Sequence, residues 1–596
     1  MILAPLCTAL ITGLVSSGCS FAEETSSTAP PAMAPVPTAS TSTRVVNADL
    51  IRVGISDNSM VNQEYTQTQI SANGPFRAID TATGNIVFEG DAWESVTVTV
   101  DNQGFDVQGR TKKPGLRPSA PVQGPIRFEP ANSATLLRIP NITRKGSIPS
   151  YRGALEVTRG YSSPKKLSTV NILSLQDYLK AVVPNELPAR YGLEAVKAQA
   201  VAARNYALRP REKAWPQFDI CDSQYCQAYY GAHTETPETT RALAETEGQV
   251  ALYNGELVLA LYSSSHGGWG EAYHNVFSDN ATKSFPGTPM AYLTGGADIP
   301  SEKFSDLSSE NAARTFWTTP FPSYDVDSPH HRWERVWKRS EIERTIEAGL
   351  AEVSQDNFTK PFVSPLFKPG QRIGVLKRIT VNQRGVSGKA MEITIEASNG
   401  TWKVQKEFLI RKVFKQNGRM MPSANVVFSH LTDGSGNLVS LKANGGGFGH
   451  GVGMSQLGAS WMGKHGYHFP QIIQHYYKGA SIGSLPVSPG SAPVKTTFFT
   501  RQPQGRLMVK LPTTDGINKP VLKVHVNNTV YAVDTGKTQT LDVGNALHAQ
   551  QLNTLLLEPM ETPEPATLFG ITLPTAGTAT VKPEQIKVWV ELVPAQ

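Results

Sequence analysis

The chain has 596 residues, of which 39% are hydrophobic and 18% are charged, and its net charge is +6. This length exceeds one ordinary domain core, so two or more domains are expected, and the hydrophobic share excludes a chain that is disordered throughout. The 50 glycines and 42 prolines favour a loop-rich, strand-rich protein over a helical bundle. The positive charge is spread thinly and forms no basic block, which argues against a nucleic-acid partner.

The first 19 residues form a short apolar segment that ends in small residues and Cys19. This pattern is typical of a secretory signal rather than a membrane span, so we expect export to the periplasm or cell envelope. The approach to Cys19 resembles a bacterial lipobox without its usual aliphatic residue, so lipidation of Cys19, and with it a membrane anchor, is left open. Residues 20–48 are rich in Ser, Thr, Ala and Pro, and are predicted to be an extended tether.

Short alternating apolar runs separated by turn residues dominate the chain from about Asp49 to residue 172. This spacing predicts antiparallel strands in a barrel or sandwich rather than βαβ units. The runs are LIRVGI, GPFRAID, NIVFEG, ESVTVTV, IRFEP, ATLLRI, ALEVTRG and TVNIL. We expect the helices that follow to emerge from this β body.

Two helices are predicted between Ser174 and Leu208. Asp177 follows Ser174 by three residues, which is typical of a helix start, and the first helix is expected to stop just before Pro184. Apolar residues recur every three or four positions along the second helix, which predicts one stripe facing a core. These residues are Leu193, Val196, Ala200, Ala203 and Ala207.

Glu186 lies in the predicted bend between the two helices, between Pro184 and Pro188. Lys197 and Arg204 are seven residues apart on one face of the second helix, and we expect both to lean toward Glu186. Lysines and arginines on helices usually form a solvated face, and a glutamate near a helix start often only favours the helix dipole. Taken alone, this cluster of charges favours the structural interpretation.

Four long segments change that balance. In chain order they are DYLKAVVPNELP, EAVKAQAVAARNYAL, GHGVGMSQLGASWMGKHG and IIQHYYKGASI. Together, in this order, they resemble the SpoIID/LytB family of lytic transglycosylases and amidase enhancers. The resemblance implies an α+β fold in which an antiparallel, strand-rich body carries a cluster of helices around an active-site cleft. We expect residues 49–484 to form this catalytic domain. Residues 485–596 lie outside the resemblance, and their strand patterns predict a small C-terminal all-β domain of unknown role.

The resemblance implies an exported peptidoglycan lytic transglycosylase. Glu186 would protonate the glycosidic oxygen between MurNAc and GlcNAc and then accept the proton of the muramic acid C6 hydroxyl, leaving 1,6-anhydroMurNAc ends. Lys197 and Arg204 would bind substrate oxygens or support the site. The alternative is a non-catalytic protein that binds glycan and enhances a cell-wall amidase, and a purely structural envelope protein is a third class.

A loop from Ser263 to Glu271 resembles the family's active-site loop, so Ser263, Ser265 and Glu271 are candidate substrate-binding residues. His266 follows Ser265, but adjacent residues do not by themselves give the geometry of a nucleophile and its base, and no partner acid is evident. A hydrolase triad is therefore not expected. The Asn254-Gly255 pair just before this loop, between two apolar runs, predicts a β-hairpin.

The glycine-rich segment Gly445–Gly453 precedes a helix expected to end near Lys464. The resemblance implies that its backbone amides approach a glycan, with His450 and Gln456 supplying side-chain hydrogen bonds. The alternative is a glycine-rich turn that lets two elements pack. Upstream, Trp337 and its neighbour Trp333 are interpreted as core residues rather than sugar-stacking rings.

Cys221 and Cys226 are the only cysteines beyond Cys19. Some family members bind zinc in this loop through two cysteines and histidines, but the matching positions here are Trp215 and Tyr225. Two thiolates alone make a poor zinc site, so a disulfide is preferred in an exported protein and no cofactor is expected. The nearby His233 keeps zinc as the alternative.

Overall fold

The computed structural model describes residues 50–109, 121–209, 215–223, 225–254, 256–279, 284–298 and 304–484, and parts of the C-terminal region at 494–500, 505–510, 520–534, 538–542, 546, 551–559 and 589–594. These residues form an α+β protein with eight α-helices and mainly antiparallel sheets, as predicted. Cys19 and the predicted signal and tether segments lie outside them. Within the described ranges, no helix is long and apolar enough to cross a membrane.

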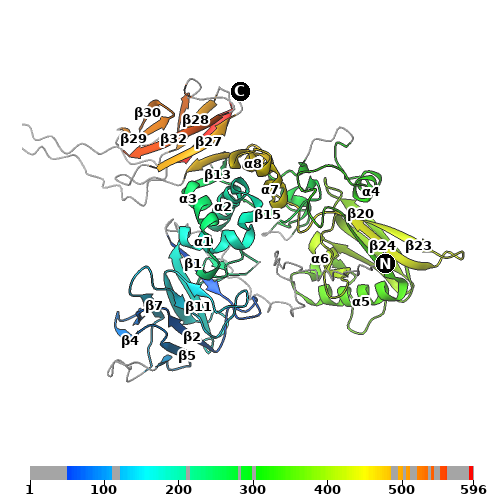
Figure 1. Ribbon diagram of the computed structural model, residues 1–596. Helices are drawn as coiled ribbons and strands as arrows, with labels where there is room; N and C mark the ends of the chain where they lie inside the picture. The colour runs from blue at the N-terminus through cyan, green and yellow to red at the C-terminus, as the bar shows by residue number, and fades with distance from the viewer. Residues whose placement is uncertain are drawn as a thin grey trace, which may run out of the picture.

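Two sheets make an N-terminal β body, drawn in blue and cyan in Figure 1, and confirm the predicted strands. The larger sheet has the order β12 (Ile220–Cys221), β1 (Leu50–Ile55), β11 (Leu167–Ser174), β10 (Ala154–Arg159), β7 (Ile126–Pro130), β3 (Phe76–Asp80) and β4 (Ile86–Gly90). The smaller sheet has the order β6 (Phe105–Gly109), β5 (Ser95–Val100), β2 (Gln67–Ala72), β8 (Leu137–Arg138) and β9 (Ser150–Tyr151). Because apolar residues alternate along these strands, one face of each can join a shared core.

Five helices pack at one end of the β body: α1 (Leu175–Glu186), α2 (Leu193–Leu208), α3 (Pro237–Glu245), α7 (Gln456–Lys464) and α8 (Phe469–Tyr476). The predicted stripe of α2 is confirmed, because Val196, Ala200 and Ala203 join the core of the β body. A second face of α2, which includes Ala198 and Ala202, packs in a separate core with α7 and α8. The small alanine side chains let helices approach α2 from two sides, so α2 is the central helix of this group.

A small sheet beside these helices has the order β14 (Glu256–Leu257), β13 (Gln249–Tyr253) and β26 (Ser481–Ser484). Pairing of Tyr253 with Glu256 confirms the predicted hairpin, and Asn254 has a φ of 50° in its turn. The predicted Gly255 lies outside the described residues. Because β26 pairs with β13, the chain up to Ser484 belongs to this group of helices and strands.

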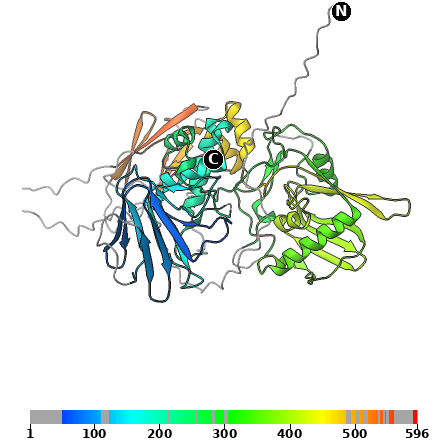
Figure 2. The same ribbon diagram turned by 60° about the horizontal axis from the view of Figure 1, so that its bottom comes forward.

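A second lobe, the inserted lobe, is green and yellow in Figures 1 and 2 and comprises residues 304–445, within the long segment between β15 (Tyr262–Ser263) and β25 (Met454–Ser455). These two short strands pair in parallel, Tyr262 with Met454 and Ser263 with Ser455, so the chain leaves and re-enters the first lobe at adjacent points. The lobe contains α4 (Glu310–Thr318), α5 (Arg339–Gln355), α6 (Glu407–Val413) and two sheets. The sheets are β18 (Trp333–Lys338), β24 (Leu438–Gly445) and β23 (Val426–Thr432); and β19 (Val363–Ser364), β22 (Gly400–Gln405), β21 (Ala390–Ala397) and β20 (Leu376–Arg384). In the segment before the lobe, β16 (Trp269–Gly270) pairs with β17 (Gly296–Ala297), and Val276 and Leu293 of this segment join the core of the first lobe.

The core of the inserted lobe is separate from those of the first lobe. It includes Trp337, which is fully buried as predicted, while Trp333 is partly buried against it. The described C-terminal strands form two further antiparallel sheets, in agreement with the predicted all-β region. Their orders are β27 (Val494–Thr500), β32 (Gln551–Pro559), β29 (Pro520–Val526) and β30 (Thr529–Asp534), and β31 (Thr538–Asp542), β28 (Gly505–Lys510) and β33 (Trp589–Pro594).

Candidate active site

Glu186 is the last residue of α1. Ser174 caps the start of this helix by accepting a hydrogen bond from the Asp177 N–H at 3.0 Å, as predicted. The expectation that α1 stops before Pro184 is wrong. Pro184 lies in the last turn, where its missing N–H removes a single helical bond, and the side chain of Asn185 donates to the Ala181 carbonyl at 2.6 Å. Glu186 is therefore held on the end of a rigid helix rather than in a bend.

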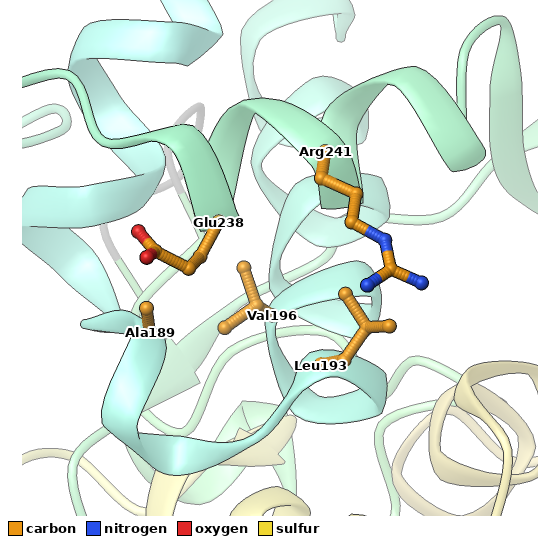
Figure 3. Close-up of a pocket in the computed structure, with 5 residues that line it drawn as sticks. All are labelled: Ala189, Leu193, Val196, Glu238 and Arg241. Carbon is orange, nitrogen blue, oxygen red and sulfur yellow. The ribbon is translucent and has the colours of Figure 1, made fainter.

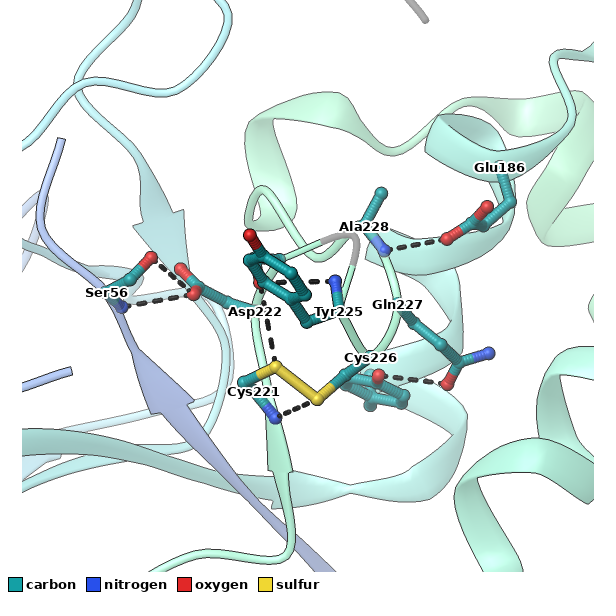
Figure 4. Close-up of a disulfide and its surroundings, with 10 residues drawn as sticks. Ser56, Glu186, Cys221, Asp222, Tyr225, Cys226, Gln227 and Ala228 are labelled. Carbon is teal, nitrogen blue, oxygen red and sulfur yellow. Dashed lines mark hydrogen bonds between the residues drawn. A yellow bond between two sulfur atoms is a disulfide. The ribbon is translucent and has the colours of Figure 1, made fainter. Parts of the chain in front are cut away.

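The carboxyl group of Glu186 is bound by a backbone amide. The N–H of Ala228 donates to Oε1 of Glu186 at 2.7 Å (Figure 4). Burial raises the pKa of Glu186 to about 7, and the bond from Ala228 partly opposes this rise because it favours the carboxylate. Glu186 can therefore exist in both protonation states near neutral pH.

The loop that carries Ala228 is fixed at two points (Figure 4). A disulfide joins Cys221 to Cys226, with 5.6 Å between their Cα atoms. Asp222 accepts hydrogen bonds from the Ser56 hydroxyl at 2.6 Å and from the Arg144 guanidinium at 2.8 Å, and both members of the Asp222–Arg144 ion pair are buried. The β body and the disulfide thus hold the Ala228 amide against Glu186.

The zinc alternative required a histidine beside these cysteines. Nε2 of His233 instead lies 3.3 Å from the Arg144 carbonyl oxygen. Across the described ranges, no three His, Cys, Asp or Glu side chains are grouped so that they could hold a metal ion.

Two tyrosines lie close enough to Glu186 for charge interaction. Burial raises the pKa of Tyr230, and the Glu186 carboxylate raises it further. The same two causes, in the same order, raise the pKa of Tyr262. Gln227 donates to the Tyr262 hydroxyl at 3.1 Å and accepts from the Tyr178 hydroxyl at 3.0 Å, so the loop also fixes one of these rings. Both tyrosines therefore remain neutral hydroxyl donors near Glu186.

Lys197 and Arg204 do not face Glu186 as the spacing predicted. Lys197 forms ion pairs with Glu194 at 2.7 Å and with Glu245 of α3 at 2.6 Å. The i,i+3 carboxylate of its own helix and the neighbouring α3 offer this cation closer partners than Glu186 does. Lys197 thus ties α2 to α3.

Arg204 is only 1% exposed. It donates to the Gln249 carbonyl at 2.8 Å, and burial lowers its pKa to about 10. Because α2 is covered on two faces, Arg204 lies in the interior, where its bond to the Gln249 carbonyl supports the start of β13.

Gln456, at the start of α7, does reach the site. Its amide donates to the backbone carbonyl of Glu186 at 3.0 Å and to the side chain of Gln199 at 3.3 Å. Gln456 is 5% exposed, and its hydrogen bond to the Glu186 carbonyl holds the end of α1 in place. His450 is partly buried, and its Nδ1 accepts a hydrogen bond from the Val452 N–H at 3.0 Å. Burial, followed by the charges of His266 and Lys389, lowers the pKa of His450 to about 3.

The candidate residues of the loop from Ser263 to Glu271 are also used inside the protein. Ser263 Oγ accepts from the Gly451 N–H at 3.2 Å, and Ser265 donates to Asp325 at 2.8 Å. Glu271 is fully buried and accepts from the hydroxyl of Ser387 at 2.6 Å. The expected role of Ser265 and Glu271 in substrate binding is therefore not supported, because their oxygens bind the inserted lobe.

The glycine-rich segment makes the same crossing between lobes. A side chain at Gly267 would place its Cβ 2.7 Å from the Gly447 nitrogen, and Gly267 has a φ of +70°. Gly447 donates to the His330 carbonyl, and Phe448 donates to the Ser265 carbonyl. These glycines therefore allow two backbone segments to pack closely, which is the alternative left open by the sequence.

A pocket of about 180 Å³ lies between the turn after α1, the start of α2 and α3 (Figure 3). Its lining residues come from the turn after α1, from α2 and from α3, and they are Ala189, Leu193, Val196, Glu238 and Arg241. Ala189 follows Glu186 by three residues, but Glu186 itself does not line the pocket. The pocket adds a mainly apolar surface with one charged residue of each sign next to the candidate site.

Sequence reasoning missed Ala228, Gln227 and the two tyrosines. Ala228 acts through its backbone, so its residue type carried no signal. The spacing of Cys221 and Cys226 was the available signal, because a closed loop at this point holds the next residues in a fixed position. Asp325, which binds Ser265, was also missed because it lies in the inserted lobe.

Two family models match separate parts of this chain. Residues 163–253 match the family model described as Stage II sporulation protein, SpoIID, and this range contains Glu186 and Ala228. Residues 279–453 match a domain of unknown function, DUF8618, and make up most of the inserted lobe. The fold and the site thus define an α+β protein that carries a SpoIID-type domain around a half-buried glutamate.

Several relatives are known by name. The chain is 28% identical over 321 residues to the amidase enhancer of Bacillus subtilis, covering 51% of this chain but only 40% of that protein. It is 23% identical to the stage II sporulation protein D of B. subtilis, covering 56% of this chain and 78% of that protein. An uncharacterized protein of Brachyspira hyodysenteriae is 25% identical and matches 73% of this chain and 93% of its own length. The chain therefore carries a SpoIID domain and is similar to proteins of the SpoIID/LytB family.

Proposed function

We propose that this protein is an exported peptidoglycan lytic transglycosylase in which Glu186 is the acid and base. The observation that carries the proposal is a carboxyl group whose pKa is raised to about 7, where a general acid and base is most efficient near neutral pH. Glu186 is held by a helix end, a backbone amide and Gln456, and among the residues that the structure describes neither a cation nor a second carboxylate contributes to its pKa. Hydrolysis by two carboxylates requires a second acid within reach, so a lone glutamate favours the transglycosylase reaction.

In this mechanism the protonated Glu186 gives its proton to the glycosidic oxygen between MurNAc and GlcNAc as the bond from C1 to that oxygen breaks. The resulting carboxylate then accepts the proton of the C6 hydroxyl while O6 bonds to C1, which closes the 1,6-anhydro ring without water. The Ala228 N–H stabilises the carboxylate formed between the two steps. The neutral hydroxyls of Tyr230 and Tyr262 are available to bind sugar oxygens.

The test is to incubate the parent protein and Glu186→Gln with purified glycan strands and identify the products by mass. The parent should release fragments with 1,6-anhydro ends, each one water lighter than a hydrolysis product. Glu186→Gln keeps the shape of the side chain but cannot exchange the proton, so cleavage should fall by about 100-fold or more. Hydrated ends from the parent would contradict the proposal and indicate a hydrolase.

A second candidate function is enhancement of a cell-wall amidase, and the observation in its favour is the similarity to a protein named amidase enhancer. In this reading the same surface binds glycan and presents it to the amidase. A parent protein that leaves glycan strands intact, and a Glu186→Gln variant that stimulates an amidase as well as the parent does, would establish this function instead.

A further inference from the structure

The β body carries a row of cations and aromatic rings that begins beside Glu186. It contains Tyr230, Lys145, His233, Arg138 and Trp93, and we call these five residues the cation-aromatic strip. Lys145 lies over the ring of Tyr230, with its Nζ 5.5 Å from the ring centroid. Arg138 lies over the ring of Trp93 at 5.1 Å.

His233 connects these two pairs. Nε2 of His233 lies 3.3 Å from the carbonyl oxygen of Arg144, the residue before Lys145. Burial lowers the pKa of His233, and the charges of Lys145 and Arg138 lower it further. At the other end, Tyr230 interacts with the charge of Glu186 and lies two residues beyond Ala228, which binds Glu186. The strip is therefore continuous with the candidate active site.

Three of the five strip residues are exposed to solvent, and Tyr230 and Arg138 are half-buried. Trp93 is 64% exposed, and Lys145 and His233 are also exposed. An exposed tryptophan held under a guanidinium is an uncommon use of so large an apolar ring on a surface, because burial of tryptophan is strongly favourable. The ring is thus available for stacking by a ligand.

Two strip residues adopt backbone conformations that their side chains disfavour. Trp93 has a φ of 68° in the turn between β4 and β5. Lys145 has a φ of 48° and Gly146 one of 77°, in a two-residue turn closed by mutual hydrogen bonds between Arg144 and Ser147. A turn with positive φ at both central residues favours Asn-Gly over Lys-Gly. Non-glycine residues held in such conformations cluster at functional sites.

We propose that the cation-aromatic strip binds the glycan strand of peptidoglycan on one side of Glu186, with its rings stacked on sugar faces and its cations paired with the carboxylates of stem peptides. This inference rests on the proposed function for the choice of glycan as the ligand. The occupant fits the strip because peptidoglycan combines sugar rings with regularly spaced negative charge. Its continuity with Glu186 places bound sugars in register with the bond to be cut.

The turn geometry supplies sharp variants. Lys145→Asn and Trp93→Asn remove the cation and the ring while placing a residue that tolerates positive φ at each position. Both variants should therefore melt at or above the temperature of the parent. Lys165→Asn is the matched control, because Lys165 is an exposed lysine elsewhere on the β body.

Binding is measured in the full chain carrying Glu186→Gln, so that the strand is not consumed. The probes are soluble glycan strands with and without stem peptides. Lys145→Asn and Trp93→Asn should each weaken binding to peptide-bearing strands about five- to twentyfold, and Lys165→Asn less than twofold. Lys145→Asn should lose less affinity for stripped strands and should reduce the salt dependence of binding to peptide-bearing strands.

Binding by both variants equal to that of the Lys165→Asn control would overturn the proposal. A variant that binds glycan normally but no longer associates with a cell-wall amidase would also overturn it, by making the strip a protein-docking surface. The outcome is separable from the proposed function. Strip-dependent binding by a parent that cuts no glycan removes only the transglycosylase assignment, whereas Glu186-dependent cleavage with strip-independent binding removes only the strip.

Discussion

The backbone N–H of Ala228 donates to Oε1 of Glu186 across 2.7 Å, and this bond joins the disulfide-closed loop to the end of α1. It favours the ionised carboxyl group, whereas burial favours the neutral one. Burial has the larger effect, so the pKa of Glu186 rises to about 7. The loop therefore limits a shift that the surroundings of the helix end create.

This balance predicts a pH dependence of stability. Because the folded pKa of Glu186 is raised above its ordinary value of 4.5, the folded state binds the extra proton between about pH 4.5 and 7, and stability falls as pH rises through that window. Glu186→Gln removes this loss. Above pH 7 the variant should be more stable than the parent, by up to about 3 kcal/mol, and near pH 4 the two should be alike. Urea denaturation at a series of pH values measures the difference, and parallel curves for the two proteins would contradict the raised pKa.

The disulfide gives a second prediction. Cys221→Ser with Cys226→Ser should lower the free energy of unfolding by about 2 kcal/mol, as expected for closure of a short loop. If the freed loop releases the Ala228 amide, the pKa of Glu186 should rise further and the pH profile of any Glu186-dependent activity should move to higher pH. Thiol labelling of the unreduced, denatured parent, with the labelled peptides identified by mass, is the companion measurement, and labelled Cys221 and Cys226 with one bound zinc would refute the disulfide.

The charged candidates show where sequence patterns succeed and fail. The period of α2 correctly predicted the stripe through Val196, and Ser174 correctly predicted the start of α1, because both depend on local geometry. The same period could not predict that α2 is buried on a second face, because the covering residues in α7 and α8 lie more than 250 positions away. For this reason Arg204 was expected in a cleft but lies in the interior.

The inserted lobe likewise makes contacts with the loop after Ser263 that the sequence of the loop could not predict. The motif resembled a substrate-binding loop, and its spacing alone carried no information about the side chains that would meet it. The structure places Asp325 and Ser387, both from the inserted lobe, against Ser265 and Glu271. Contacts between the lobes depend on the whole fold. A local sequence pattern could therefore predict that Ser265 and Glu271 lie in a loop, but not which residues they contact.

Arg204 should therefore act on stability. Arg204→Ala leaves the Gln249 carbonyl without its donor and opens a cavity, so the free energy of unfolding should fall by about 2–4 kcal/mol. Arg241→Ala, at an exposed arginine on α3, is the control and should change it by less than about 0.5 kcal/mol. Thermal denaturation of both variants gives the comparison. If Arg204→Lys instead keeps the melting temperature of the parent but loses activity, the result would indicate that Arg204 binds the substrate.

Asp325 should stabilise the junction between the two lobes. Its carboxylate accepts hydrogen bonds from the Ser265 hydroxyl at 2.8 Å and from the N–H groups of His266 at 2.7 Å and Gly267 at 2.8 Å. Burial alone would raise the pKa of Asp325, but the bonds from His331, Ser265 and Ser323 and the charge of His266 hold it well below its ordinary value. The stability that Asp325 contributes is therefore present above about pH 4 and is lost as pH falls below that value.

Asp325→Asn removes this charge and replaces one acceptor oxygen with a donor that faces other donors. The variant should lose about 3 kcal/mol or more of stability at pH 7, and the loss should shrink as pH falls, because the parent then loses the same carboxylate. Asp327→Asn, at an exposed aspartate two residues away, should behave like the parent at every pH. The local measurement is limited proteolysis at pH 7 of the segment between Ser263 and Met454. A loosened junction should expose the chain segments that connect the two lobes before the β body unfolds. Equal protection of the two variants at the junction would show that Asp325 does not hold the lobes together.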